Sequence, residues 1–191
     1  QNEMPRKDPA CHLTFDDGPC PETTPKLLQL LNEKKVKATF FFTGENAEKY
    51  PELVEMTATA GHQLGNHSYD HKFSLLESLD SFTRGIDITI NIIEKVCGQK
   101  PPVYRPPFGI IDEARSRVVK ERNLKLVYWG AMAEDWNNLG EVEITRRIMS
   151  QLSAGTIIVL HELKSTEKQC RAATNNIIDR THKRGFRFGL I

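Results

Sequence analysis

The chain has 191 residues, of which 39% are hydrophobic, and its formal net charge is +1 at pH 7. This length and composition suit one globular domain over residues 1–191 with a single hydrophobic core. A charge balance so close to zero gives no electrostatic basis for binding nucleic acid or an anionic membrane. No apolar run approaches the length of a membrane span, and the first ten residues lack the apolar core of a signal peptide.

The hydrophobic pattern alternates along the chain between short apolar runs and amphipathic segments. Strands are predicted at 12–15, 37–42, 62–67, 103–105, 125–132, 156–161 and 186–191. Helices are predicted at 25–35, 47–60, 75–96 (as one helix or two), 112–122, 144–152 and 168–183. About seven strands that alternate with helices indicate an α/β fold with a parallel sheet, either an irregular (β/α) barrel or a doubly wound sheet.

Four cysteines stand at wide and unequal spacing: Cys11, Cys20, Cys97 and Cys170. They do not form the paired CxxC clusters of a structural zinc site. The even number favours a secreted protein with at least one disulfide bond, and four free thiols is the alternative. The spacing does not select among the possible pairings.

Titratable side chains follow the predicted strands at their carboxyl ends. They are Asp16, Asp17, His67, Arg105, Asp135 and His161. In parallel barrels the active site forms from the carboxyl ends of the strands and from the loops that follow them. We therefore expect these side chains to meet at one end of one sheet.

The HSYDH segment has the spacing of a metal site. His67 and His71 are four residues apart, so one helical turn would place both imidazoles on the same side. A carboxylate from Asp16 or Asp17 would complete a two-histidine, one-carboxylate set that leaves positions open for water and substrate. The other carboxylate could then accept a proton. Taken alone, DDGP is also typical of a capped turn, and His161 of a buried core histidine.

Two further residues suggest partners for these groups. Arg105 precedes the stiff PPFG turn, and an arginine held by such a turn can pair with a carboxylate and lower its pKa. Asp135, beside Trp136, offers a carboxylate partner for a histidine next to an apolar wall. Each feature has a structural alternative, but it is improbable that all of them share one rim by chance.

Together these segments resemble the polysaccharide deacetylases of carbohydrate esterase family 4, which share the NodB-homology domain and include chitin, peptidoglycan and acetylxylan deacetylases. The resemblance rests on TFDDGP (14–19), HSYDH (67–71), RPPFG (105–109), EDW (134–136) and VLHE (159–162). These motifs follow the family's order along almost the whole chain. The resemblance implies an irregular (β/α) barrel, in agreement with the alternation of strands and helices.

The resemblance also implies a metal site and a cofactor. Asp17, His67 and His71 match the residues that hold a divalent metal ion, usually Zn²⁺ and in some members Co²⁺. Asp16 matches the catalytic base of the family. The implied reaction is the removal of acetyl groups from a polysaccharide that contains N-acetylglucosamine, such as chitin, with release of acetate.

Other catalytic roles are likewise implied by the resemblance. Arg105 matches the residue that orients the base Asp16. His161 matches the general acid, and Asp135 matches the carboxylate that tunes it. Protonation by such an acid is needed because an amide nitrogen leaves poorly without a proton.

The resemblance also implies substrate contacts, and the chain departs from the family pattern in one of the loops near them. Phe108 would hold the oxyanion through its backbone N–H, and Trp136 and Leu160 would line the pocket for the acetyl methyl group. The family's fourth motif typically begins with an aspartate, where this chain has Met132, and Glu134 stands next to Asp135. Because these loops shape the substrate groove, the alternative is a divergent member that keeps the metal site but has lost or altered deacetylase activity.

A third and weaker interpretation is a simple cytosolic metal-binding domain. The proposed substrate and the cysteines favour secretion or a place at the cell wall. The expected partner is an acetylated polysaccharide, with no nucleic acid and no membrane span. Nothing in the sequence indicates the oligomeric state.

Overall fold

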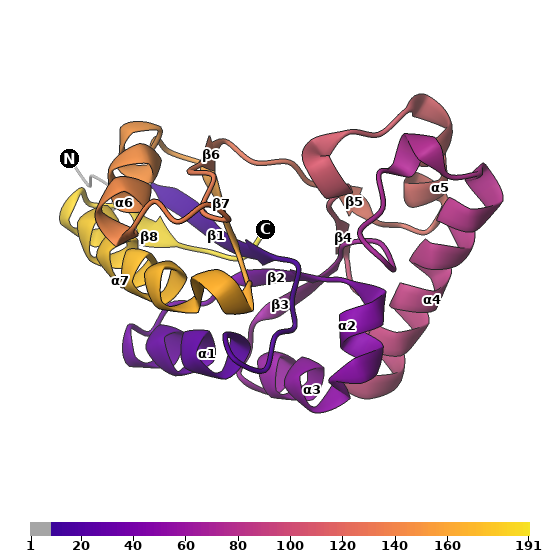
Figure 1. The fold of residues 1–191 in the computed structure, drawn as a ribbon, viewed down its shortest axis with the longest axis horizontal. Helices are drawn as coiled ribbons and strands as arrows, with labels where there is room; N and C mark the ends of the chain where they lie inside the picture. The colour runs from indigo at the N-terminus through magenta and orange to yellow at the C-terminus, as the bar shows by residue number, and fades with distance from the viewer. Residues whose placement is uncertain (1–8) are drawn as a thin grey trace, which may run out of the picture.

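The computed structural model describes residues 9–191, and its centre is a curved sheet in which every strand pairing is parallel. The strand order is β5-β4-β3-β2-β1-β7-β6, and β8 pairs with β1. The sheet curls into a half-barrel (Figure 1), as the irregular (β/α) barrel prediction requires. The strands are β1 (Ala10–Asp16), β2 (Thr39–Phe42), β3 (Gln63–Asn66), β4 (Val103–Tyr104), β5 (Lys125–Leu126), β6 (Ala131–Met132), β7 (Ile157–His161) and β8 (Arg187–Phe188).

Helices cover the outside of the sheet. α1, α6 and α7 lie on the side of β1 and β7, whereas α4 and α5 lie beyond β3 and β4 (Figure 1). The α-helices are α1 (Thr24–Glu33), α2 (Gly44–Lys49), α3 (Pro51–Thr59), α4 (Leu79–Cys97), α5 (Glu113–Glu121), α6 (Glu141–Ser150) and α7 (Glu167–Lys183). Three short 3₁₀ helices join them within the described residues: η1 (Ser74–Leu76), η2 (Pro107–Gly109) and η3 (Lys164–Thr166).

The segment 125–132 is not one strand, as the sequence predicted, but two strands on opposite edges of the sheet. β5 pairs with β4, and β6 pairs with β7. Between them, Val127 N–H donates to the Tyr104 carbonyl at 2.9 Å and Gly130 N–H donates to the Ile157 carbonyl at 2.9 Å. The apolar run therefore crosses the open side of the half-barrel. The segment has the apolar composition of a strand because each of its two ends is a short strand that pairs with the sheet.

The predicted helix at 47–60 is also two elements. Tyr50 leaves the helical region, with φ −130° and ψ 58°, and Pro51 begins α3. Proline has no N–H to donate and disfavours the helical conformation in the residue before it, so the helix breaks there. The predicted helix at 75–96 becomes η1 followed by α4. Ser78 caps the start of α4, and Gly98 terminates it in the left-handed conformation with φ 71°.

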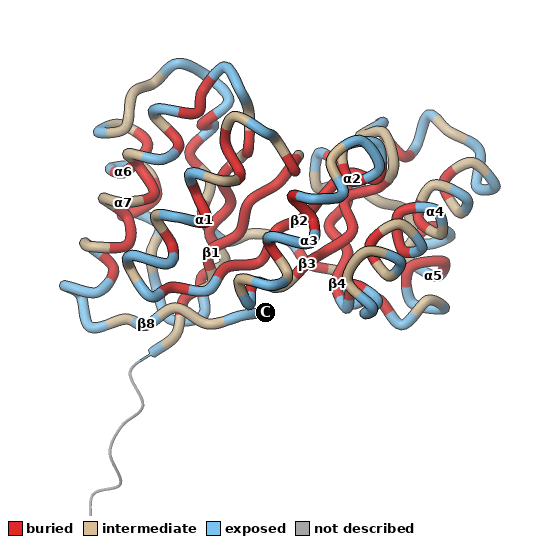
Figure 2. The backbone as a smooth tube through the Cα atoms, turned by 90° about the horizontal axis from the view of Figure 1, so that it is seen from below, coloured by how far each residue is buried: buried red, intermediate tan, exposed pale blue. Residues whose placement is uncertain are grey.

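Both faces of the curved sheet are packed. The buried strands run through the centre of the molecule, and the exposed residues lie mainly on the outer sides of the helices (Figure 2). The outward face packs against the helices through a large core that includes Leu13, Phe15 and Leu160. The inward face holds a small core of Phe41, Val103 and Val127, with Ile157 and Ile191 packed against it. Alternate residues of each strand therefore serve different cores.

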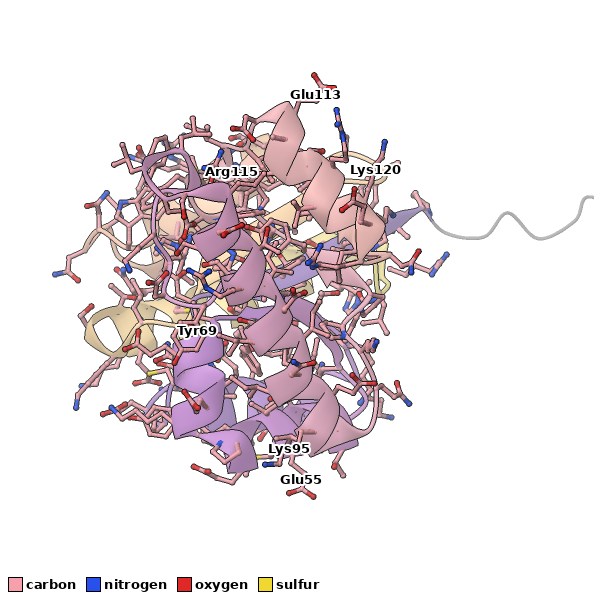
Figure 3. The ribbon with its side chains drawn as sticks, turned by 90° about the vertical axis from the view of Figure 1, so that its right-hand side faces the viewer. Glu55, Tyr69, Lys95, Glu113, Arg115 and Lys120 are labelled. Atoms are coloured by element: carbon pink, nitrogen blue, oxygen red, sulfur yellow. The ribbon has the colours of Figure 1, made fainter. Side chains whose placement is uncertain are left out.

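A second outer core joins α4 to α5. Figure 3 looks at this side, with both helices across the front. Arg115 of α5 pairs with Asp112, donates to the Glu77 carbonyl before α4, and lies 5.7 Å from the ring of Phe82. This packing supports the loop 67–78, which carries two of the predicted site residues.

The disulfide prediction is wrong: all four cysteines lie within the described residues, and each is a free thiol. Cys11 lies on β1, Cys97 ends α4 and Cys170 lies on α7, whereas Cys20 is in the loop between β1 and α1. The Cys11 thiol donates to the Ser153 carbonyl at 3.4 Å, the Cys97 thiol lies 4.0 Å from the Val54 carbonyl, and burial raises the pKa of the Cys170 thiol. Among the described residues, no helix combines the length and apolar character needed to cross a membrane.

Candidate metal centre and active site

The carboxyl ends of the central strands bring the predicted residues together. Asp16 ends β1 and is the register partner of His161 at the end of β7. His67 follows β3, and Arg105 follows β4, where its N–H donates to the Asn66 carbonyl at 3.0 Å. A cavity of about 480 Å³ opens over this edge, lined by Asp16, Asp17, His67, His71, Pro106, Phe108, Trp129, Met132, Trp136, Val159 and His161.

Asp17, His67 and His71 form the candidate metal centre. Asp17 Oδ1 lies 3.4 Å from His67 Nε2 and 3.1 Å from His71 Nε2. One ligand atom from each residue lies within 4.8 Å of the other two, the only such group among residues 9–191. Both Asp17 (φ 72°) and His71 (φ 54°) adopt the left-handed conformation that non-glycine residues rarely accept. Two adjacent loops are thus held in strained turns that direct three ligand atoms to one point.

The donor set fits a divalent ion. His67 Nδ1 lies 2.7 Å from the Arg105 carbonyl, and as the donor of that bond it leaves Nε2 with a lone pair facing Asp17. Asp17 Oδ1 is buried without a hydrogen bond of good geometry. Burial raises the pKa of Asp17, but a hydrogen bond from His67 and the charges of His67, His161 and His71 in their protonated forms outweigh it and lower the pKa to about 2. A divalent ion in place of those protons would favour the same ionised carboxylate. An ionised, unpaired carboxylate oxygen beside two imidazole nitrogens is the arrangement that a metal ion satisfies.

Asp16 is held by a buried arginine. The Arg105 side chain has no exposed surface, and its Nη1 donates to Asp16 Oδ1 and to Thr14 Oγ1, each at 2.7 Å. Its Nη2 donates to the Tyr128 carbonyl at 3.2 Å, so the guanidinium also ties down the segment that crosses the half-barrel. The guanidinium stacks 4.1 Å from the ring of Phe41. The predicted pairing of Arg105 with Asp16 is present, and it fixes one oxygen of the carboxylate.

Phe41 can occupy this position because Gly65 has no side chain. A Cβ atom on Gly65 would lie 2.5 Å from the Phe41 ring and 3.0 Å from Val103. Contacts this short are not tolerated in packed interiors. The glycine of β3 therefore makes room for the ring on which Arg105 rests.

His161 and Asp135 form the second predicted pair. Asp135 is fully buried, and its carboxylate oxygens lie 2.8 Å from His161 Nδ1 and accept the His161 backbone N–H at 2.8 Å. Burial lowers the pKa of His161, but the hydrogen bond and negative charge of Asp135 outweigh it and raise the pKa to about 9. The Trp136 ring stands edge-on to His161, with centroids 5.1 Å apart. Near neutral pH His161 is a cation whose Nε2 can give up a proton.

Of the three predicted substrate-contacting residues, two line the cavity and one does not. Phe108 and Trp136 line the cavity, with 58% and 43% of their surfaces exposed, and the Phe108 ring lies 4.9 Å from His71. Leu160 is a correction, because it is fully buried in the outer core against the helices. Strand residues alternate between faces, so the side chain that shares the inner face with His161 is Val159. Val159 lines the cavity in place of Leu160.

Several residues of the site were missed in the sequence. Pro106, Trp129 and Val159 line the cavity, and Glu162 is buried just beyond β7. Met132, which the sequence singled out as a departure from the family motif, also lines the cavity. Burial raises the pKa of Glu162 to about 8, and its carboxyl accepts a hydrogen bond from Thr24. The two-residue alternation that ends at His161 would have identified Val159 and assigned Glu162 to the outer face. No local pattern identifies Trp129, because its position depends on the crossing of the half-barrel.

Comparison with known proteins identifies the family. The sequence profile of the family described as "Polysaccharide deacetylase" matches residues 3–127. The chain belongs to this family. A peptidoglycan-N-acetylglucosamine deacetylase of Bacillus cereus is 37% identical to this chain over 177 residues, which cover 92% of this chain. The chain spans 64% of the length of that relative.

Two solved structures share the fold of this chain. One is a peptidoglycan N-acetylglucosamine deacetylase in complex with 4-naphthalen-1-yl-N-oxidanyl-benzamide, with a TM-score of 0.92, 35% identity and coverage of 98% of this chain and 88% of that chain. The other is a wild-type family 4 pseudoenzyme of Bacillus anthracis, with a TM-score of 0.88, 26% identity and coverage of 98% of this chain and 65% of that chain. The family thus includes both enzymes and pseudoenzymes on this fold.

Proposed function

We propose that this polysaccharide deacetylase is a metal-dependent hydrolase that removes the acetyl group from N-acetylglucosamine units of a cell-wall polysaccharide. The observation that carries the proposal is the meeting of three groups in one cavity: the Asp17–His67–His71 centre, the Asp16–Arg105 pair and the Asp135–His161 pair. Peptidoglycan is the first substrate to test, because the 37% identical relative is named for it. Chitin oligomers follow. The place of action is then outside the cell membrane, at the wall.

Asp17, His67 and His71 would hold a divalent ion, which would supply a Lewis acid for the acyl carbonyl. We propose Zn²⁺, since two histidines and one carboxylate are a common catalytic zinc set. Asp16 accepts a proton from the attacking water, and Arg105 keeps the carboxylate aimed at it. His161 then donates its proton to the nitrogen of the breaking C–N bond, while Asp135 stabilises the charged imidazole. Acetate and a free amine leave.

Acetate release from a panel of acetylated glycans tests this function. The panel comprises peptidoglycan, N-acetylglucosamine oligomers and acetylxylan, each with the Zn²⁺-loaded protein, with the chelated protein, and with the Asp16→Asn variant. We expect release from at least one N-acetylated glycan, its loss with chelator, and its return with Zn²⁺ or Co²⁺. Release from none of them by the metal-loaded protein would contradict the proposal.

A second candidate is a family member without turnover. Met132 stands where the family typically has an aspartate, and a 26% identical structure of this fold is a pseudoenzyme. This alternative predicts glycan binding that Asp16→Asn leaves unchanged and no acetate at any enzyme concentration. The naphthyl hydroxamate found with the 35% identical deacetylase offers a further probe, because hydroxamates chelate metal ions. We expect it to compete with substrate for this cavity.

A further inference from the structure

The half of the cavity beside His161 is lined by apolar side chains. Val159 of β7 and Met132 of β6 are register partners, and both line the cavity one layer below His161. Trp136 closes this side from above, with its ring edge-on to His161. We call the space bounded by Met132, Val159, Trp129 and Trp136 the acyl compartment.

The walls of the acyl compartment differ in their freedom to move. The Trp129 ring is fixed against Gly109, since a Cβ atom on that glycine would lie 2.6 Å from the ring. Val159 is a fully buried, β-branched residue of a central strand. Met132 lies on the edge strand β6, partly exposed, and its unbranched thioether side chain can adopt several rotamers. Of these three walls, Met132 is therefore the one that can move aside for a larger group without a change in the backbone.

The size and polarity of the cavity agree with this assignment. The whole cavity, of which the acyl compartment is one part, has a volume of about 480 Å³, within the roughly 300–1,000 Å³ of sites that enclose drug-sized ligands. A carboxylate at position 132 would face the acyl chain and resist burial beneath it, because an unpaired charge is costly to remove from water. Met132 instead offers apolar surface that gains from covering extra methylene groups.

We propose that the acyl compartment accepts acyl groups longer than acetyl, up to butyryl, and that Met132 determines this range. The proposal rests on the function proposed above and extends it to N-propionyl and N-butyryl amides. The chemistry balances as for acetyl: the water oxygen joins the acyl carbon, and the C–N bond breaks. The nitrogen takes the proton from His161, and the corresponding carboxylate leaves with the amine.

Binding of short hydroxamic acids tests the compartment without turnover. Acetohydroxamic and butyrohydroxamic acids carry the same chelating group and differ by two methylenes, so the ratio of their Kd values reports on the acyl chain alone. With the Zn²⁺-loaded protein, calorimetry should show about fourfold tighter binding per methylene, about fifteenfold for the pair. A ratio of one or less, or binding of neither compound, would overturn the proposal.

Variants then identify the residue responsible. Met132→Asp should reduce the ratio to threefold or less, and Met132→Leu, which keeps the wall apolar, should retain it. Val142→Asp is the matched control for the added charge, because Val142 of α6 is 70% exposed and does not line the cavity. Thermal melting and zinc content verify that each variant is folded and loaded. A Met132→Asp ratio equal to that of the wild type would overturn the role of Met132.

Turnover separates this proposal from the proposed function. Glucosamine oligomers carrying N-acetyl, N-propionyl or N-butyryl groups are each assayed for release of the carboxylate. Release of all three supports both proposals. Release of acetate with no detectable butyrate overturns the wide acyl range and leaves the deacetylase function standing. Release from none, together with the fifteenfold hydroxamate ratio, contradicts the hydrolase function but supports the compartment.

Discussion

The metal side of the cavity is built from turns and hydrogen-bonded imidazoles, whereas the acyl side is built from strand residues that pack against one another. On the metal side, the positive φ angles of Asp17 and His71 and the bond between His67 and the Arg105 carbonyl fix the direction of each ligand atom. On the acyl side, Val159 and Met132 are held by strand register and by contact. The direction of a metal ligand tolerates little change, whereas a wall of packed apolar side chains accepts side chains of other sizes at a modest cost in stability. Under the two proposals, the metal side therefore sets the reaction, and the acyl compartment sets the range of acyl groups.

Among the variants on the metal side, loss of the proposed base Asp16 should have the largest effect on activity. Asp16→Asn keeps the shape of the side chain and its contact with Arg105 but removes the proton acceptor. We expect kcat to fall by about 10²–10⁴-fold with Zn²⁺ content unchanged, measured by acetate release and metal analysis. Activity near that of the wild type would show that another group accepts the proton.

Loss of the arginine should affect stability as well as activity. Arg105→Met leaves the buried Asp16 carboxylate without its partner, and we expect the free energy of unfolding to fall by about 3–5 kcal/mol in denaturant titrations. Arg117→Met is the control, because Arg117 pairs with Glu113 at the surface of α5 and contributes little. Equal effects of the two variants would contradict the central place of Arg105.

The acid side predicts a pH dependence. Because Asp135 raises the pKa of His161 to about 9, the proton donor is present below that pH and is lost as the pH rises through it. Asp135→Asn removes the cause of the raised pKa, so the basic limb of kcat should move to lower pH. Glu134→Gln, whose carboxylate pairs with Arg147 outside the cavity, should leave the limb in place. A limb that does not move in Asp135→Asn would contradict His161 as the proton donor.

The contribution of the Asp135–His161 pair to the free energy of unfolding should likewise be lost as the pH rises. A group whose pKa is raised by folding stabilises the folded state below its unfolded pKa, near 6.5 for histidine, and this contribution is lost as the pH rises through the folded value. The difference in unfolding free energy between the wild type and Asp135→Asn should therefore shrink between about pH 6.5 and 9, measured at several pH values.

The smallest effect on activity is expected outside the cavity. Leu160→Ala removes a buried side chain of the outer core and should lower the free energy of unfolding by about 2–5 kcal/mol while the preference among acyl groups stays the same. Val159→Ala, one residue earlier on the inner face, should change that preference. Denaturation and the N-acyl panel together measure both. A changed preference in Leu160→Ala would contradict the assignment of the two faces.

How far the sequence predicts the site depends on which interactions hold each residue. The placement of Asp16, His67, Arg105 and His161 at one rim follows from a general property of parallel sheets, so strand ends alone predicted it. The pairing of Arg105 with Asp16 was implied by the family motifs, and the structure adds its support from Phe41. Leu160 was misassigned because the strand was read as uniformly apolar, although counting back two residues from His161 places Val159 on the inner face and Leu160 on the outer one.

The fold shows the same limit. The strand at 125–132 was predicted from a continuous apolar run, but the sequence does not reveal that the run bridges two edges of an open sheet. The break at Tyr50 was readable from Pro51, as a helix seldom continues through the residue before proline. The cysteines could not be judged by number alone, because pairing depends on distances between elements far apart in sequence.

The central claim is that Asp17, His67 and His71 hold one catalytic metal ion. Native mass spectrometry and zinc titration of the wild type and of His71→Gln test it most directly. His12→Gln is the control, because His12 lies on β1 but does not line the cavity. We predict one Zn²⁺ per chain for the wild type and for His12→Gln, and a loss of at least tenfold in affinity for His71→Gln. A wild-type chain that binds no ion, or a His71→Gln variant that binds it equally well, would contradict the account.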